Sequence, residues 1–210
     1  RARKESLRLN AGSTGPHPRT SPTHSQSAAA SAAAAGICAE QAFQTRAVDR
    51  LVVGEKLCPF APPVSAPPKL RIRASSAAHA DEVVAEVAEE ASLLRAGIDA
   101  PAPAVGHTTL LVLDREQMGS DMLGWRDLIA LSWRIQQEAI VDAGHAEHLQ
   151  LVLFHPTATH TTFVEPGAPP DAGDYSIRAP YPTVQLLREV DVQAGVRSYP
   201  DAARIPARNR

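Results

Sequence analysis

The alternation of short apolar runs with amphipathic helical patterns constrains the fold of this chain most strongly. Two runs, HTTLLVLD over 107–114 and LQLVLF over 149–154, have the length and aliphatic composition of buried strands. A third run, KLRIRAS over 69–75, alternates apolar and basic residues, which is typical of a half-buried or edge strand. Helical spacing of apolar residues recurs around these runs, over 44–55, 79–97, 124–144 and 182–190.

This order of elements predicts one α/β domain over 44–209. Strands that alternate with helices usually form a parallel sheet built from right-handed βαβ units. We therefore expect a small, mostly parallel sheet of three to four strands, flanked by helices. A long loop over 155–180 and a C-terminal helix complete the domain, and the segment 159–166 is the candidate for the fourth strand.

Residues 1–40 differ in composition from the rest of the chain. They are rich in serine, threonine and alanine, lack hydrophobic periodicity, and contain one acid, Glu5, before Glu40. Their basic residues are Arg1, Arg3, Lys4, Arg8 and Arg19. This composition is typical of an organellar transit peptide. It predicts a disordered tail and a chloroplast location, with the mitochondrion or the cytoplasm as alternatives; a plain low-complexity tail fits the same residues.

Composition and motifs exclude several classes of protein. A net charge of −2 argues against a general nucleic-acid binder, and no apolar stretch approaches the roughly 20 residues of a membrane span. The two cysteines, Cys38 and Cys58, cannot form a cysteine-based zinc site. The sequence has no glycine-rich phosphate loop, GxSxG or HExxH motif. We therefore expect no nucleic-acid or membrane partner, no metal and no cofactor.

Two predicted strands place polar residues at one edge of the sheet. In parallel α/β sheets, ligands bind beyond the carboxyl ends of the strands. His155 follows the strand at 149–154 and begins the long loop, while Asp114 follows the strand at 107–114. His155 is therefore a candidate general base, with a structural anchor of the loop as the alternative.

Cys58 is the other candidate catalytic residue. It lies in GEKLCPFAPP (54–63), between the first helix and a proline-rich connection, and has no second cysteine at redox spacing. The C-terminal end of a helix disfavours a thiolate, so a nucleophilic Cys58 requires a nearby cation such as Arg178 or Arg188. The alternative is a small buried hydrophobic residue beside Phe60.

Arg178 and Arg188 are the candidate anion-binding residues. A guanidinium presents planar, bidentate donors to a carboxylate or phosphate, and RAPYP (178–182) holds Arg178 on a rigid turn. The alternative is an ordinary salt bridge for each: Arg178 with Asp174, and Arg188 with Glu189 or Asp191. The complete set of candidate substrate-binding residues is Arg178, Arg188, Asp174, Tyr181, Glu189 and Asn209.

Short motifs along the domain resemble those of the DUF1415 family, which is found in bacteria and photosynthetic eukaryotes and has no assigned activity. In order, they are LCPFA (57–61), FHP (154–156), YSIRAPYP (175–182), LLRE (186–189), YPD (199–201) and IPARN (205–209). The resemblance spans about 46–209. The family pattern usually has other residues where this chain has Thr157, Ala158, Asp174, Ile177, Ala179 and Gln185.

Two functions are consistent with these residues. The first is a small organellar enzyme or ligand-binding domain that acts on a small anionic substrate at a site of Cys58, His155, Arg178 and Arg188. The alternative is a non-catalytic assembly or interaction domain, in which the shared motifs anchor loops. The first hypothesis predicts anion binding that is lost in Arg178→Ala.

Overall fold

The computed structural model describes residues 41–65, 68–98, 107–114, 118, 124–161, 171–199, 201, 204 and 205. The tail predicted for 1–40, most of the candidate strand at 159–166, and Asn209 therefore lie outside the described residues. None of the helices in the described part of the chain is long and apolar enough to cross a membrane.

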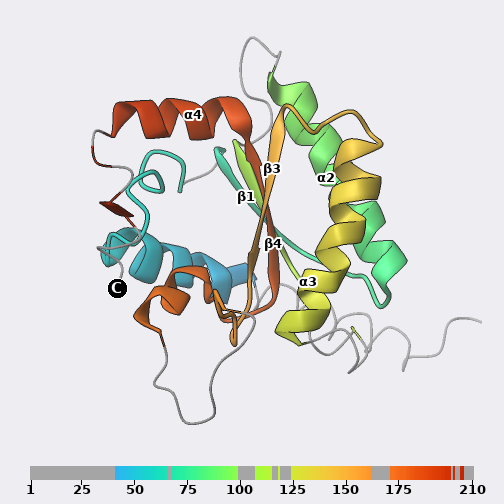
Figure 1. Ribbon diagram of the computed structural model, residues 1–210, viewed down its shortest axis with the longest axis horizontal. Helices are drawn as coiled ribbons and strands as arrows, with labels where there is room; N and C mark the ends of the chain where they lie inside the picture. The colour runs from blue at the N-terminus through green and yellow to red at the C-terminus, as the bar shows by residue number, and fades with distance from the viewer. Residues whose placement is uncertain are drawn as a thin grey trace, which may run out of the picture.

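Four strands form one mixed sheet in the order β1-β2-β4-β3 (Figure 1). The strands are β1 (Leu70–Ala74), β2 (Thr108–Val112), β3 (Leu149–Phe154) and β4 (Thr183–Arg188). β1 and β2 are parallel, whereas β4 is antiparallel to both of its neighbours, β2 and β3. β1, β2 and β3 therefore run in one direction and β4 in the other. The predicted α/β class and strand number are confirmed, but the sheet is mixed rather than mostly parallel.

β4 corrects the helix that the sequence predicts over 182–190, because residues 183–188 form a strand. The helical pattern depended on Val184, Leu187 and Val190, which follow one another at intervals of three residues. β4 lies between β2 and β3, and both of its faces are covered, so apolar side chains occur on both faces. The strand therefore lacks the alternation of apolar and polar residues that marks a half-buried strand. Val184 and Leu186 face the main core, and Leu187 faces the other side.

The other three predicted helices are confirmed, and two further helical segments follow β3 and β4. The helical elements are η1 (Val48–Gly54), which continues a helix over 41–47, α2 (Ala80–Ile98), α3 (Trp125–Arg134), η3 (Ile135–Val141), η4 (Ala172–Ile177) and α4 (Glu189–Ser198). In α2, Asp81 and Glu82 occupy the first turn and Arg95 the last. Acids at the N-terminal end and a base at the C-terminal end interact favourably with the helix dipole and so stabilise the helix.

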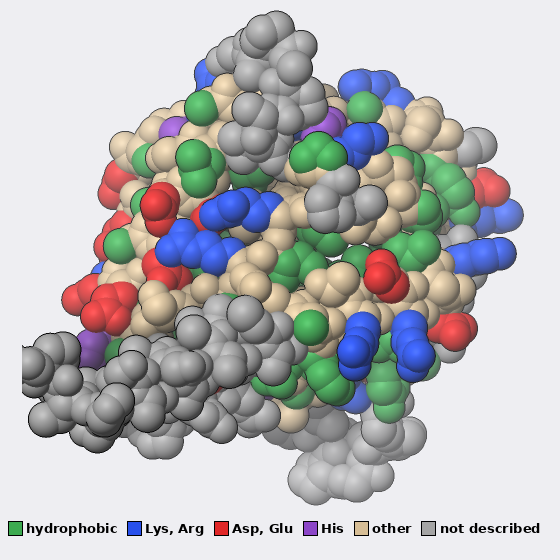
Figure 2. All heavy atoms as spheres, turned by 180° about the vertical axis from the view of Figure 1, so that it is seen from behind, with side chains coloured by type: hydrophobic (Ala, Val, Ile, Leu, Met, Phe, Trp, Pro, Cys, Tyr) green, Lys and Arg blue, Asp and Glu red, His purple; other side chains and the backbone are tan. Residues whose placement is uncertain are grey.

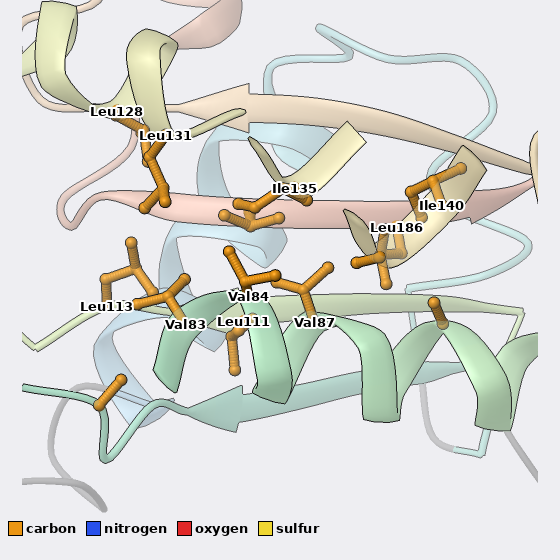
Figure 3. Packing of buried hydrophobic residues seen from close by; sticks show 14 of the residues in the cluster. Val83, Val84, Val87, Leu111, Leu113, Leu128, Leu131, Ile135, Ile140 and Leu186 are labelled. Atoms are coloured by element: carbon orange, nitrogen blue, oxygen red, sulfur yellow. The ribbon is translucent and has the colours of Figure 1, made fainter. Parts of the chain in front are cut away.

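α2, α3 and η3 cover one face of the sheet and form the main core (Figure 1). Apolar side chains at helical spacing on α2 meet alternate side chains of β2 and β4 (Figure 3). The central residues of this core are Val83, Val84, Val87, Leu111, Leu113, Leu128, Ile135, Ile140 and Leu186. Because these side chains are almost fully buried, each contributes roughly 1.5–3 kcal/mol to folding.

A buried carboxylate ties α2 to the edge strand β1. The Glu90 side chain is 1% exposed and accepts hydrogen bonds from Arg71 Nε at 2.8 Å, Arg73 Nη1 at 3.0 Å and Thr109 Oγ1 at 3.3 Å. Burial raises the pKa of Glu90, but the donors of Arg71 and Arg73 outweigh it and hold the pKa below its ordinary value. The carboxylate is therefore charged in the folded protein at neutral pH.

The opposite face of the sheet is covered by separate segments. In Figure 1, α4 lies near one end of this face, while the helix 41–54 and η4 lie near the other. Val48 of η1 packs on Leu70 and Leu110 in a small second cluster, with Ile72 beside it. A cavity remains between these segments and the sheet.

Candidate functional site

A cavity of about 380 Å³ lies between the second face of the sheet and the segments that cover it. Its wall is mainly apolar, and Figure 2 shows the molecule hollowed on this side, with hydrophobic side chains around the opening. The volume falls within the range of small-molecule sites, roughly 300–1,000 Å³. Polar side chains in the wall include Gln44, His107, Gln150, Arg178, Gln185 and Asp191.

The floor of the cavity is the sheet itself. Leu110 of β2, Gln185 and Leu187 of β4, and Val152 of β3 line it. Successive side chains of a strand point to opposite faces, so Leu110 faces the cavity while its neighbour Leu111 faces the main core. Both faces of this sheet are therefore apolar, but only one is closely packed.

The outer wall contains Cys58 and Phe60, from the connection that follows η1. η1 ends at Gly54, so Cys58 lies beyond the helix, although its N–H still donates to the Val52 carbonyl at 3.4 Å. The Phe60 ring lies against Gly195 of α4, where a Cβ would be 3.1 Å from Phe60 Cδ1. The absence of a side chain at Gly195 therefore allows the connection to dock closely on α4.

Arg178 lines the cavity near the carboxyl end of β3. Its Nε donates to the Ala158 carbonyl at 3.1 Å, and its guanidinium carbon lies 4.7 Å from the centre of the Tyr175 ring. Asp174 is its ion-pair partner, with Nη2 and Oδ2 3.7 Å apart, which is beyond hydrogen-bond distance. Among the described residues, the two Nη groups have no hydrogen-bond acceptor, so they retain donors for a ligand.

Asp174 connects η4 to the loop that follows β3. It is 4% exposed and accepts the His160 backbone N–H at 2.8 Å through Oδ1. Together with the Arg178 pair, this contact links η4 to the loop that follows β3. Tyr181 meets Phe43 edge to face, at 6.3 Å between ring centres, and so joins the first helix to the residues before β4.

Arg188 lies at the other end of the sheet because β4 runs antiparallel to its neighbours. It is 7% exposed. Its Nε donates to Asp191 Oδ2, its Nη2 contacts His107 Nδ1 at 2.7 Å, and its Nη1 donates to the Gly97 carbonyl at 3.3 Å. His107 and Asp191 line the cavity, whereas Arg188 supports them from behind.

His155 and Glu189 lie outside the cavity wall, and each makes structural hydrogen bonds. His155 is 2% exposed; its Nδ1 accepts the Thr157 N–H at 3.1 Å, and its ring packs 6.2 Å from that of Trp125. Glu189 accepts from Gln150 and from Gln193 at the start of α4. The predicted edge is present, since the last residues of β2 and β3, Val112 and Phe154, both align with Thr183.

The candidate residues are therefore divided between different places. Cys58 and Arg178 line one cavity, Arg188 stands behind its far end, and His155 is packed outside it. Both salt bridges considered from the sequence exist, Arg178 with Asp174 and Arg188 with Asp191. No cluster of three or more metal-ligating side chains occurs among the described residues.

Sequence reasoning missed the cavity residues Gln44 and His107. Gln44 is 4% exposed, and its Oε1 is buried without a hydrogen-bond partner among the described residues. An unpaired buried amide oxygen costs about 1–3 kcal/mol, so a ligand with a suitable donor would relieve it. His107 immediately precedes β2, but its partner Arg188 is 81 residues away in the sequence. Nothing in the sequence pattern reveals that contact.

The family model described as "Protein of unknown function (DUF1415)" matches residues 41–210. No significant match was found among curated proteins or among solved structures. The matched range includes the whole sheet and every described residue of the cavity wall.

Proposed function

The chain belongs to the DUF1415 family, and on this premise we propose that it binds a small, largely apolar carboxylic acid in the cavity. The apolar part of the ligand lies on the sheet floor between Leu110, Val152 and Leu187. Its carboxylate meets the Nη donors of Arg178. The sequence predicted an anion-binding function for Arg178 and Arg188, and this proposal keeps that function for Arg178 alone, because only Arg178 lines the cavity.

The single observation that carries this proposal is the charged donor Arg178 in the wall of a mainly apolar cavity. A guanidinium in such a position favours a carboxylate, because charge-assisted hydrogen bonds are stronger than neutral ones. Asp174 balances the charge of Arg178, but at 3.7 Å it does not occupy the Nη donors with hydrogen bonds. The apolar wall excludes water and favours an aliphatic or aromatic body over a small inorganic anion.

Decanoate and its neutral counterpart decanamide test this proposal on the full chain by isothermal titration. We expect decanoate to bind at least about tenfold more tightly, since a charge-assisted hydrogen bond contributes about 1.5–3 kcal/mol. Arg178→Gln should abolish this preference and leave decanamide binding unchanged. Thermal unfolding of the variant checks that the Tyr175 and Ala158 contacts of Arg178 are not needed for folding.

Arg126→Gln is the matched control, because Arg126 is exposed on α3, on the other side of the sheet. This variant should bind decanoate as the unaltered protein does. Equal affinities for decanoate and decanamide, or full decanoate affinity in Arg178→Gln, would contradict the assignment of Arg178. Failure of both compounds to bind would contradict the proposed function itself.

A further inference from the structure

We propose that His107 and Asp191 form a second polar subsite, at the opposite end of the cavity from Arg178, and that it takes a hydroxyl group. The preferred ligand is then an elongated hydroxy acid, with its carboxylate at one end and its hydroxyl at the other. This inference rests on the proposed function and specifies the ligand of the same cavity.

The register of the sheet separates the two ends. The Ile177 carbonyl accepts the His155 N–H at 3.2 Å, so Arg178 follows directly on the carboxyl end of β3. Asp191 lies in the first turn of α4, just after Arg188, which is paired with the first residue of β3. The cavity floor extends along β3 from Phe154 to Gln150. Four residue steps of a strand span about 13 Å.

Arg188 fixes this subsite without being available to a ligand itself. Its three donating groups are directed at Asp191, His107 and Gly97. Its charge is balanced by Asp191, so the subsite as a whole is close to neutral. A ligand carboxylate would be repelled by Asp191, and a ligand ammonium would be repelled by Arg188. A neutral polar group avoids both costs.

The contacts of Arg188 also determine which nitrogen of His107 carries the proton. Nδ1 of His107 lies 2.7 Å from Arg188 Nη2 and 3.1 Å from Asp191 Oδ2; because a guanidinium only donates hydrogen bonds, the shorter contact assigns Nδ1 as the acceptor from Arg188. The imidazole proton is then on Nε2, where no hydrogen-bond acceptor is present among the described residues. Beside it, Asp191 uses Oδ2 for Arg188 and retains acceptor capacity on Oδ1.

His107 therefore offers a donor and Asp191 an acceptor to the same end of the cavity. A hydroxyl group both donates and accepts, and so satisfies the two together. A methyl group in the same place would offer no hydrogen bond to Nε2 of His107 or to Oδ1 of Asp191, which disfavours a plain fatty acid. The pairing therefore selects for a hydroxyl at the end remote from the carboxylate.

Titration of the full chain with 10-hydroxydecanoate and decanoate tests this subsite. We expect the hydroxy acid to bind about tenfold more tightly, the effect of about one hydrogen bond to a charged group. Asp191→Asn and His107→Phe should each remove most of this preference, and thermal unfolding checks that each variant is folded. If Asp191→Asn does not fold, His107→Phe gives the decisive comparison.

The outcomes separate this inference from the proposed function. If decanoate binds but the hydroxy acid binds no better, the subsite is overturned and the proposed function stands. A preference that survives in both variants also overturns the subsite, because the hydroxyl is then recognised elsewhere. If neither acid binds, both proposals are overturned.

Discussion

Replacing Leu111 with alanine is expected to lower the free energy of unfolding by about 4 kcal/mol, whereas Leu110→Ala should lower it by only about 2 kcal/mol. The two leucines are neighbours on β2 and are almost equally buried, at 2% and 4% exposure. Leu111 is enclosed by the main core, so its removal leaves an unfilled space. Leu110 already borders the cavity and has fewer packing partners to lose.

Urea unfolding of both variants measures this difference, and each serves as the control for the other. Because the two substitutions delete the same atoms from adjacent positions, differences in transfer free energy cancel. Equal losses would mean that the space beside Leu110 is as closely packed as the main core, and the cavity would then have no room for a ligand.

Glu90→Gln is expected to lower the free energy of unfolding at pH 7 by about 2 kcal/mol, below the 3–5 kcal/mol typical of a broken buried pair. The smaller loss is expected because Arg71 and Arg73 keep 46% and 26% of their side chains exposed and remain solvated. The pKa of Glu90 is lower in the folded than in the unfolded protein. Its stabilising effect is therefore complete above the unfolded value of about 4.5 and is lost as the pH falls through the lowered folded value.

The measurement is urea unfolding of the unaltered protein and of Glu90→Gln between pH 7 and pH 3. The stability difference should be constant above pH 4.5 and narrow below it. Glu89→Gln is the matched control, because Glu89 pairs with the same Arg73 but is 62% exposed. It should change stability by at most about 1 kcal/mol. A Glu90→Gln difference that grows on acidification would contradict the charged state assigned to Glu90.

The parts of the fold that the sequence predicts well are those with a clear period. α2 carries valines and alanines on one stripe and acids at its start, and β1 alternates apolar and basic residues because one side of it faces solvent and Glu90. β4 has no such signal. It is a central strand with Val184 and Leu186 on one face and Leu187 on the other, so its short apolar run resembles a turn of helix.

The error over β4 also explains why the predicted site is only partly assembled. The predicted site required Arg178 and Arg188 to lie together. An antiparallel strand instead carries Arg188 to the opposite end of the sheet, where Asp191 and His107 engage it. Cys58 and Arg178 share a cavity that depends on how η1, η4 and α4 dock over the sheet. Such long-range docking leaves no periodic trace in the sequence.

The structure places Cys58 in the wall of the cavity but does not place His155 beside it as a catalytic partner. Cys58 faces an apolar cavity that contains Arg178, and His155 is not in the cavity wall. His155 instead anchors the loop after β3 through Thr157 and Trp125, which is the structural alternative considered from the sequence. A binding role for the cavity therefore requires no chemistry at Cys58.

The most direct test of the proposed cavity ligand is a titration of the full chain with decanoate, followed through the methyl signals of leucine and valine by NMR. The proposal predicts saturable shifts for Leu110, Val152, Leu187 and Val192, all of which line the cavity. The methyl groups of Val84, Leu111 and Leu113, which belong to the main core, should not move. Shifts confined to the main core, or no saturable shift at any of these residues, would contradict it.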